Sequence, residues 1–160
     1  MVFGLRRYPG RIDFLAIVSL GFFLLILGMI FAATPNLPRE IYDFGRGFRL
    51  QQVYPGVSFF APTSNPSVVY NAAFQFCFLF GIFQVAILGA RFVLNESVGR
   101  KAGTFLGLFF WFGAAAALWL LMAGSIDWFM FLGWLVVLIG VVITVRCAIS
   151  FVFWKSARMR

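Results

Sequence analysis

The sequence predicts an all-α membrane protein, a four-transmembrane-helix bundle with an external loop between its first two helices. Hydrophobic residues make up 62% of the 160 residues, which leaves little material for a soluble domain. Each of four stretches without a charge is about as long as an α-helix that crosses a hydrocarbon layer of about 30 Å. These stretches are 14–33, 68–90, 102–123 and 128–145. We therefore expect a single transmembrane domain over residues 1–160.

Helix 1 is expected over about 13–33. Pro9 and Gly10 interrupt the basic segment before it, and Asp13 is suited to cap the positive end of the helix. The apolar stretch is longer than that of a signal peptide and lacks a small-x-small cleavage pattern. We expect it to be retained as a membrane span.

The segment 34–66 is expected to be the external loop, because it contains five of the six prolines. Apolar residues recur in its first part at intervals that are typical of a short amphipathic helix on a membrane surface. They are Leu37, Ile41, Phe44 and Phe48. The following residues, 50–60, are expected to be extended, with a turn at Pro55-Gly56.

The other three helices are expected over about 67–91, 102–123 and 127–154. Only residues 124–127 separate the last two, so these helices should be antiparallel neighbours.

The net charge of +8 is interpreted as an orientation signal and not as a sign of nucleic-acid binding. With four crossings, the two termini and the middle loop share one side, which carries ten basic residues against three on the other. The positive-inside rule then predicts a multi-pass protein of the cytoplasmic (plasma) membrane with both termini in the cytoplasm. A further interpretation assigns anionic-lipid contacts to some of these basic residues. The candidates are Arg91, Arg100, Lys101, Lys155, Arg158 and Arg160.

Small residues are expected at the helix contacts, because close backbone approach supplies much of the association between helices in lipid. Gly21 and Gly28 of helix 1 match Gly140 and Gly133 of helix 4 in depth, so we expect these pairs to face each other. Helices 2 and 3 are expected to meet at three more depth-matched pairs. These are Gly81 with Gly107, Cys77 with Gly113, and Ala73 with Ala117. Chance matches among 16 glycines are the alternative.

The sequence lacks the residues that several kinds of catalytic and metal-binding chemistry require. The sequence contains no histidine, and its two cysteines, Cys77 and Cys147, are too far apart in depth for a disulfide or a redox pair. All five acidic residues lie at or outside the predicted span boundaries. We therefore expect no enzyme activity, no cofactor and no metal site.

Two amides on helix 2 are the main polar groups inside the spans. Asn71 and Gln75 are four residues apart and share one helical face. One interpretation places them in a polar cleft beneath Tyr54 and Tyr70. The simpler alternative is that they form hydrogen bonds between helices.

These observations predict a non-catalytic structural or interaction protein, either an accessory subunit of a larger membrane complex or a self-associating assembly unit. Its expected partners are membrane lipids, other membrane subunits or copies of itself. The alternative function is a homo-oligomeric channel or carrier with a pore between protomers.

Overall fold

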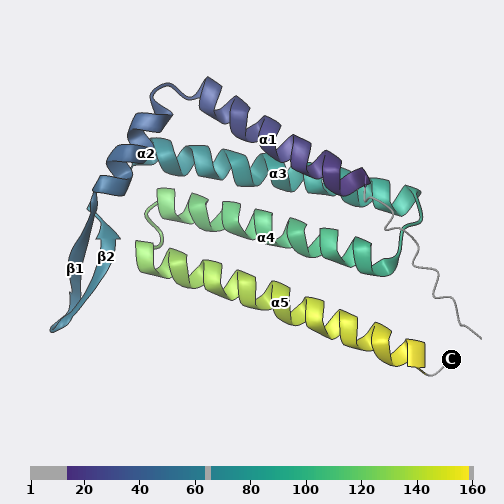
Figure 1. Cartoon of the computed structure of the whole chain (residues 1–160). Helices are drawn as coiled ribbons and strands as arrows, with labels where there is room; N and C mark the ends of the chain where they lie inside the picture. The colour runs from purple at the N-terminus through teal and green to yellow at the C-terminus, as the bar shows by residue number, and fades with distance from the viewer. Residues whose placement is uncertain (1–13, 64–65, 159–160) are drawn as a thin grey trace, which may run out of the picture.

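The computed structural model describes residues 14–63 and 66–158, and Figure 1 shows their arrangement. Five helices and two strands follow one another along the chain: α1 (Phe14–Ala33), α2 (Leu37–Arg46), β1 (Phe48–Tyr54), β2 (Val57–Pro62), α3 (Ser67–Val93), α4 (Val98–Met122) and α5 (Trp128–Arg158). Apart from the short α2, each helix contains a stretch that is long and apolar enough to cross a membrane. The prediction of four apolar spanning helices in a multi-pass membrane protein is thus confirmed.

Three of the spanning helices, α3, α4 and α5, extend beyond their uncharged stretches into charged residues. α4 begins at Val98 rather than at residue 102, and the backbone N–H groups of Arg100 and Lys101 both donate to the carbonyl of Ser97. Charged side chains end a hydrocarbon-compatible stretch but do not end a helix, because they reach outward to water or head groups. The first turn of α4 therefore carries two basic residues.

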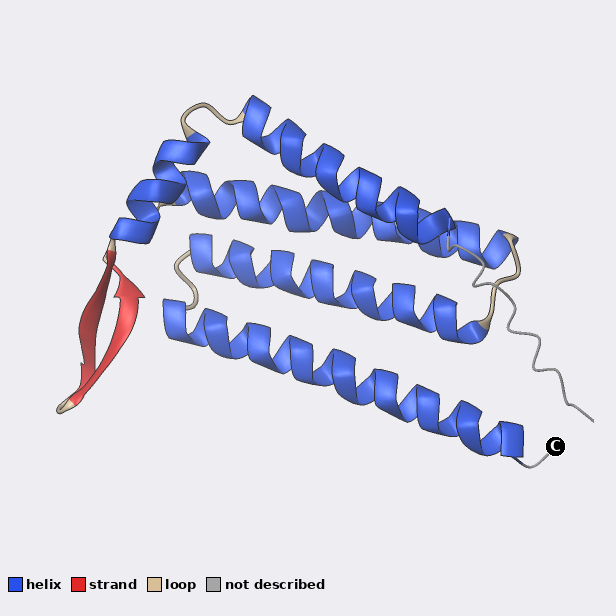
Figure 2. Cartoon of the chain, viewed as in Figure 1, coloured by secondary structure: helices blue, strands red, loops and turns tan. Residues whose placement is uncertain are grey.

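A helix and a β-hairpin occupy the segment between α1 and α3 (Figure 2). The expected amphipathic helix is α2, with Leu37 buried on its inner face. β1 and β2 pair in antiparallel fashion around the turn at Pro55-Gly56, where Gly56 adopts a positive φ of 82°. The turn prediction is confirmed, but the all-α fold class is incomplete, because the extended segment forms paired strands.

The spanning helices are arranged so that α1 and α5 lie at the two edges (Figure 1). Extensive contacts join α1 with α3, α3 with α4 and α4 with α5, and none on that scale joins α1 with α5. The predicted facing of Gly21 and Gly28 with Gly140 and Gly133 is therefore wrong within this arrangement. A Cβ atom added at any of these four glycines would have open space around it. Depth matching was not sufficient, because it does not show which helices are neighbours.

The small residues of α3 and α4 do lie near the central helix contact, but two of the three predicted pairs are not formed. A Cβ added at Gly81 would meet the ring of Phe112 at 3.2 Å, and one added at Gly113 would meet Leu138 of α5 at 2.7 Å. The pairings of Gly81 with Gly107 and of Cys77 with Gly113 are thus replaced by contacts with large side chains. Ala73, Cys77 and Ala117 belong to one hydrophobic cluster, in which Cys77 and Ala117 are buried.

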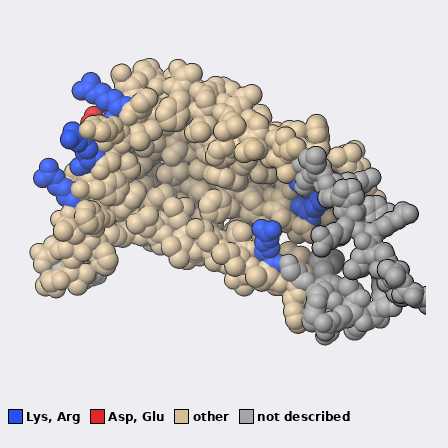
Figure 3. All heavy atoms as spheres, viewed as in Figure 1, with Lys and Arg blue, Asp and Glu red and all other residues tan. Residues whose placement is uncertain are grey.

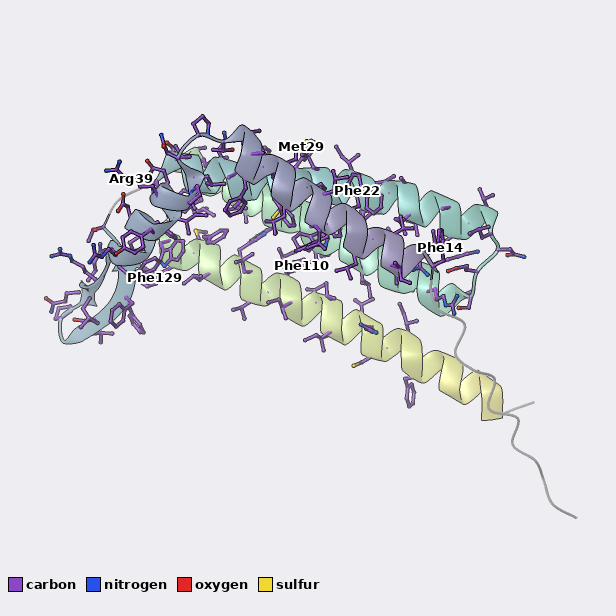
Figure 4. The ribbon with its side chains drawn as sticks, turned by 45° about the horizontal axis from the view of Figure 1, so that its top comes forward. Phe14, Phe22, Met29, Arg39, Phe110 and Phe129 are labelled. Atoms are coloured by element: carbon purple, nitrogen blue, oxygen red, sulfur yellow. The ribbon has the colours of Figure 1, made fainter. Side chains whose placement is uncertain are left out.

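Aromatic side chains close the end of the molecule that carries α2 and the hairpin, which we call the hairpin end. The ring of Trp128, at the start of α5, has four aromatic ring centroids between 5.7 and 6.4 Å away: Phe44, Phe48, Tyr70 and Phe131. The ring of Phe59 in β2 also packs against the ring of Phe129 in α5, with 5.9 Å between the ring centroids. These rings join α2, the hairpin, α3 and α5. Figure 4 shows Arg39 and Phe129 at this end, and Phe14 near the opposite end of α1.

Candidate functional site

A pocket lined by basic side chains lies at the opposite end of the molecule, where α3 joins α4; we call this the loop end. It has a volume of about 450 Å³, within the range that is common for small-molecule sites. All four spanning helices contribute to its lining. We call it the basic pocket, and its residues are Ala16, Ser19, Gln84, Ile87, Arg91, Gly99, Arg100, Gly103, Thr104 and Arg146.

The short loop between α3 and α4 fixes one wall of this pocket. Asn95 adopts a left-handed conformation with a φ of 48°, which asparagine tolerates better than most residues. The backbone N–H of Glu96 then donates to the carbonyl of Arg91, and the N–H of Asn95 donates to that of Phe92. These are the two hydrogen bonds of a Schellman motif, and they turn Glu96 back toward the last turn of α3.

Glu96 positions two of the arginines. The Arg91 Nη1 donates to Glu96 Oε2 at 2.6 Å, and the two side chains are only 8% and 15% exposed. The Arg100 Nη1 lies 3.5 Å from the other carboxylate oxygen. The 2.6 Å charge-assisted bond between two largely buried groups holds the side chains of Arg91 and Glu96 in place. Glu96 therefore contacts an arginine of α3 and an arginine of α4 at the same time.

Two glycines of α4 form the floor of the basic pocket. Gly99 and Gly103 are four residues apart on one helical face, and a Cβ atom added at either would have no neighbour within 4 Å. A second pocket, of about 540 Å³, adjoins this floor and shares Gly99, Gly103 and Arg146 with the basic pocket. We call it the adjoining pocket. Its other residues are Ser97, Val98, Ala102, Leu106 and Ile149.

Basic residues are in excess at the loop end. Within the described part of the chain, this end carries Arg91, Arg100, Lys101 and Arg146 against one acidic residue, Glu96. The hairpin end carries three basic and three acidic residues: Arg39, Arg46, Arg49, Glu40, Asp43 and Asp127. On the face seen in Figure 3, one group of basic side chains lies at the hairpin end and others lie on the half of the molecule toward the loop end. The basic pocket is therefore suited to hold an anion.

The predicted lipid-contact residues are only partly brought together. Arg91 and Arg100 line the basic pocket, whereas the Lys101 ammonium lies over the ring of Phe92, 4.7 Å from its centroid. Arg160 and the side chains of Lys155 and Arg158 lie outside the described residues. Sequence reasoning missed Arg146 as a member of this group. Its position near the end of the apolar stretch Trp128–Ile149 was the available signal, because this places it at about the same depth as the α3–α4 loop.

The predicted polar cleft is not assembled. Tyr70 is 5% exposed and stacks on Trp128 in the aromatic cluster, whereas Asn71 and Gln75 are exposed on another face of α3. Asn71 lines a pocket of about 290 Å³ together with Ser67, Val68 and Met122. The side chain of Tyr54 lies outside the described residues. Adjacent residues on a helix point about 100° apart, so Tyr70 and Asn71 do not share a face.

Comparisons of the chain with protein-family models, with curated proteins and with solved structures give no match. The site therefore has to be interpreted from its own residues.

Proposed function

We propose that this chain is a non-catalytic structural membrane protein that binds another transmembrane chain side by side in the bilayer. It acts either as an accessory subunit of a larger membrane complex or as a self-associating assembly unit. The proposal is carried by the exposed amides of Asn71 and Gln75 on α3. Neither side chain makes a hydrogen bond to any residue in the described ranges 14–63 and 66–158.

The position of these amides in the membrane is the reason that they favour a partner. Gln75 lies about 12 Å along α3 from Ser67, which is within the hydrocarbon if α3 crosses a bilayer. Lipid tails offer no hydrogen-bonding group, whereas a polar side chain on a neighbouring helix does. Each such bond contributes about 0.6 kcal/mol on average, so two amides one turn apart favour a specific lateral contact.

The edge helices add support. Only 11% of the residues in the apolar windows of α1 and α5 are buried, against 28% for α3 and 33% for α4. Each edge helix presents two exposed glycines seven residues apart, Gly21 and Gly28 on α1, and Gly133 and Gly140 on α5. Small residues on one helical face let a second helix approach closely.

Native mass spectrometry after mild solubilisation tests this proposal. The expected result is a complex heavier than the 18.0 kDa chain, with either unlike subunits or further copies of this one. An Asn71→Leu/Gln75→Leu variant should lose the complex and keep its helix content by circular dichroism. Ile82→Leu, also at an exposed position of α3, is the matched control and should keep it. A wild-type chain that is monomeric under all mild conditions would contradict the proposal.

A homo-oligomeric channel or carrier is the second candidate, and the same amides favour it. In a symmetric ring, Asn71 and Gln75 would line the pore between protomers. The arginines of the segment between α1 and α3, namely Arg39, Arg46 and Arg49, would lie at its mouth. Ion conductance across a planar bilayer, lost in the Asn71→Leu/Gln75→Leu variant, would favour this candidate over the structural one.

The proposal also places the loop end of the molecule in the cytoplasm, since basic residues exceed acidic ones there. A fluorescent protein fused to the carboxyl terminus should then fold and fluoresce on the cytoplasmic side. Labelling of that terminus from outside intact cells would reverse the orientation.

A further inference from the structure

We propose that the basic pocket binds the phosphate group of an anionic phospholipid, whose acyl chain follows the adjoining pocket along α4. The inference does not depend on the proposed function, because it concerns the loop end rather than the exposed face of α3. It rests on the charge of the pocket, on the way its arginines are held and on its apolar continuation.

The charge of the pocket favours an anion. Three guanidinium groups, from Arg91, Arg100 and Arg146, line one cavity, and Glu96 is the one carboxylate that the described residues place beside them. Several guanidinium groups around one cavity attract an anion. Gly99 lies in the first turn of α4, where the helix dipole is positive and also favours an anion.

The geometry of the groups favours phosphate in particular. Guanidinium groups present several N–H donors in one plane and commonly bind two phosphate oxygens at once. Glu96 contacts Arg91 and Arg100 together, so it positions the Arg91 side chain, and more weakly the 43% exposed Arg100 side chain, before a ligand arrives. Arg146 reaches the same cavity from α5, on the far side of the glycine floor. A phosphate group could thus be contacted from three helices.

The adjoining pocket indicates that the phosphate belongs to a lipid. It shares the glycine floor with the basic pocket, and its lining includes Val98, Ala102, Leu106 and Ile149. Leu106 lies about 12 Å along α4 from Val98, so this apolar surface extends from the helix end into the span. A soluble phosphate would use only the basic pocket, whereas an acyl chain would also cover the apolar one.

Lipid titration of the solubilised full-length chain, read by native mass spectrometry, tests the proposal. The probes are phosphatidylglycerol and phosphatidylcholine with the same acyl chains. We expect phosphatidylglycerol to bind at least about fivefold more tightly, the effect of one net charge near a membrane surface. Equal affinities of the wild-type protein for the two lipids would overturn the proposal.

Two kinds of variant locate the binding site. Arg100→Gln and Arg146→Gln should each weaken phosphatidylglycerol binding about fivefold and leave phosphatidylcholine binding unchanged. Gly103→Leu should remove the preference by filling the floor of the pocket with a side chain whose Cβ would meet no atom within 4 Å. Gly89→Leu, on α3 and outside both pockets, also has open space and is the matched control. A preference that survives all three pocket variants would overturn the assignment.

Inorganic phosphate separates the two sources of the ligand. We expect millimolar phosphate to leave lipid binding unchanged, because it lacks the acyl chain that the adjoining pocket would hold. If phosphate alone displaces phosphatidylglycerol from the wild-type protein, and Arg146→Gln abolishes that competition, the pocket binds a soluble phosphate and the lipid assignment is wrong.

Discussion

The two ends of this molecule are built from the same spanning helices but differ in packing and in charge. At the hairpin end, five aromatic rings gather around the start of α5, and basic and acidic residues balance. At the loop end, glycines leave open space over α4, and arginines line it. One end is therefore filled by the protein's own side chains, whereas the other is suited to be filled by a ligand.

With a lipid bound as proposed, tight packing and ligand binding are concentrated at opposite ends of the molecule. Large-to-small changes should be costly where rings interlock, and small-to-large changes should be tolerated where glycines face open space. The exception at the loop end is Glu96, because a buried ion pair is sensitive to the loss of either partner.

The largest effect is expected for Glu96→Gln, which removes the carboxylate that accepts from Arg91 and lies beside Arg100. Breaking a buried pair by removing one partner costs roughly 3–5 kcal/mol, because the other charge stays buried. Thermal and urea unfolding in mild detergent, followed by circular dichroism, would measure this loss. The double variant Glu96→Gln/Arg91→Met should recover much of it. If Glu96→Gln unfolds like the control Glu40→Gln, at a partly exposed position of α2, the loop end has no rigid element of this kind.

The next effect is expected for Tyr70→Ala at the hairpin end. Tyr70 is 5% exposed and contacts the rings of both Phe44 and Trp128. Truncating a buried aromatic side chain costs about 3 kcal/mol through lost burial and the cavity left behind. Tyr70→Phe keeps the ring and should cost much less. A similar loss for both variants in the same unfolding assay would attribute the effect to the hydroxyl and not to the aromatic cluster.

Much of the fold could be predicted from local sequence properties. Absence of charge located the four spans, the spacing of Leu37, Ile41 and Phe44 located α2, and Pro55-Gly56 located the hairpin turn. These features depend on residues close together in the chain. The pairing of β1 with β2 was not predicted, because a stretch of extended sequence does not by itself show whether it finds a partner strand.

The lateral arrangement of the helices could not be predicted in the same way. Gly21 and Gly133 were expected to face other glycines, yet a Cβ added at either would have open space around it. Gly113 of α4 accommodates Leu138, whereas Gly103 of the same helix faces open space. A small residue permits close approach by a backbone, a large side chain or a ligand, and sequence alone does not distinguish among these. The basic pocket itself was not predicted; Arg91 and Arg100 were named only as candidate lipid contacts, and adding Arg146 requires knowing that α5 packs beside α4.

The third prediction concerns Gly113→Ala, at the contact between α4 and α5. The added Cβ would lie 2.7 Å and 3.0 Å from the two methyl carbons of Leu138, which is 4% exposed and has little room to move. Overpacking of this kind costs about 1–3 kcal/mol. In the Leu138→Ala background, the same substitution should cost nothing further, which a double-mutant cycle of unfolding measurements would show. Equal costs in both backgrounds would mean that Leu138 is not the obstacle.

The smallest effect, and one of opposite sign, is expected for Gly103→Ala, ten residues earlier on the same helix. Its added Cβ has no neighbour within 4 Å, so the substitution introduces no clash. Alanine is favoured over glycine in a helix by roughly 0.5–1 kcal/mol, because glycine loses more backbone freedom on folding. The variant should therefore unfold at a slightly higher temperature than the wild-type protein. If Gly103→Ala destabilises the chain as Gly113→Ala does, α4 is packed alike at both positions. The loop end would then not be the open, ligand-ready end of the molecule.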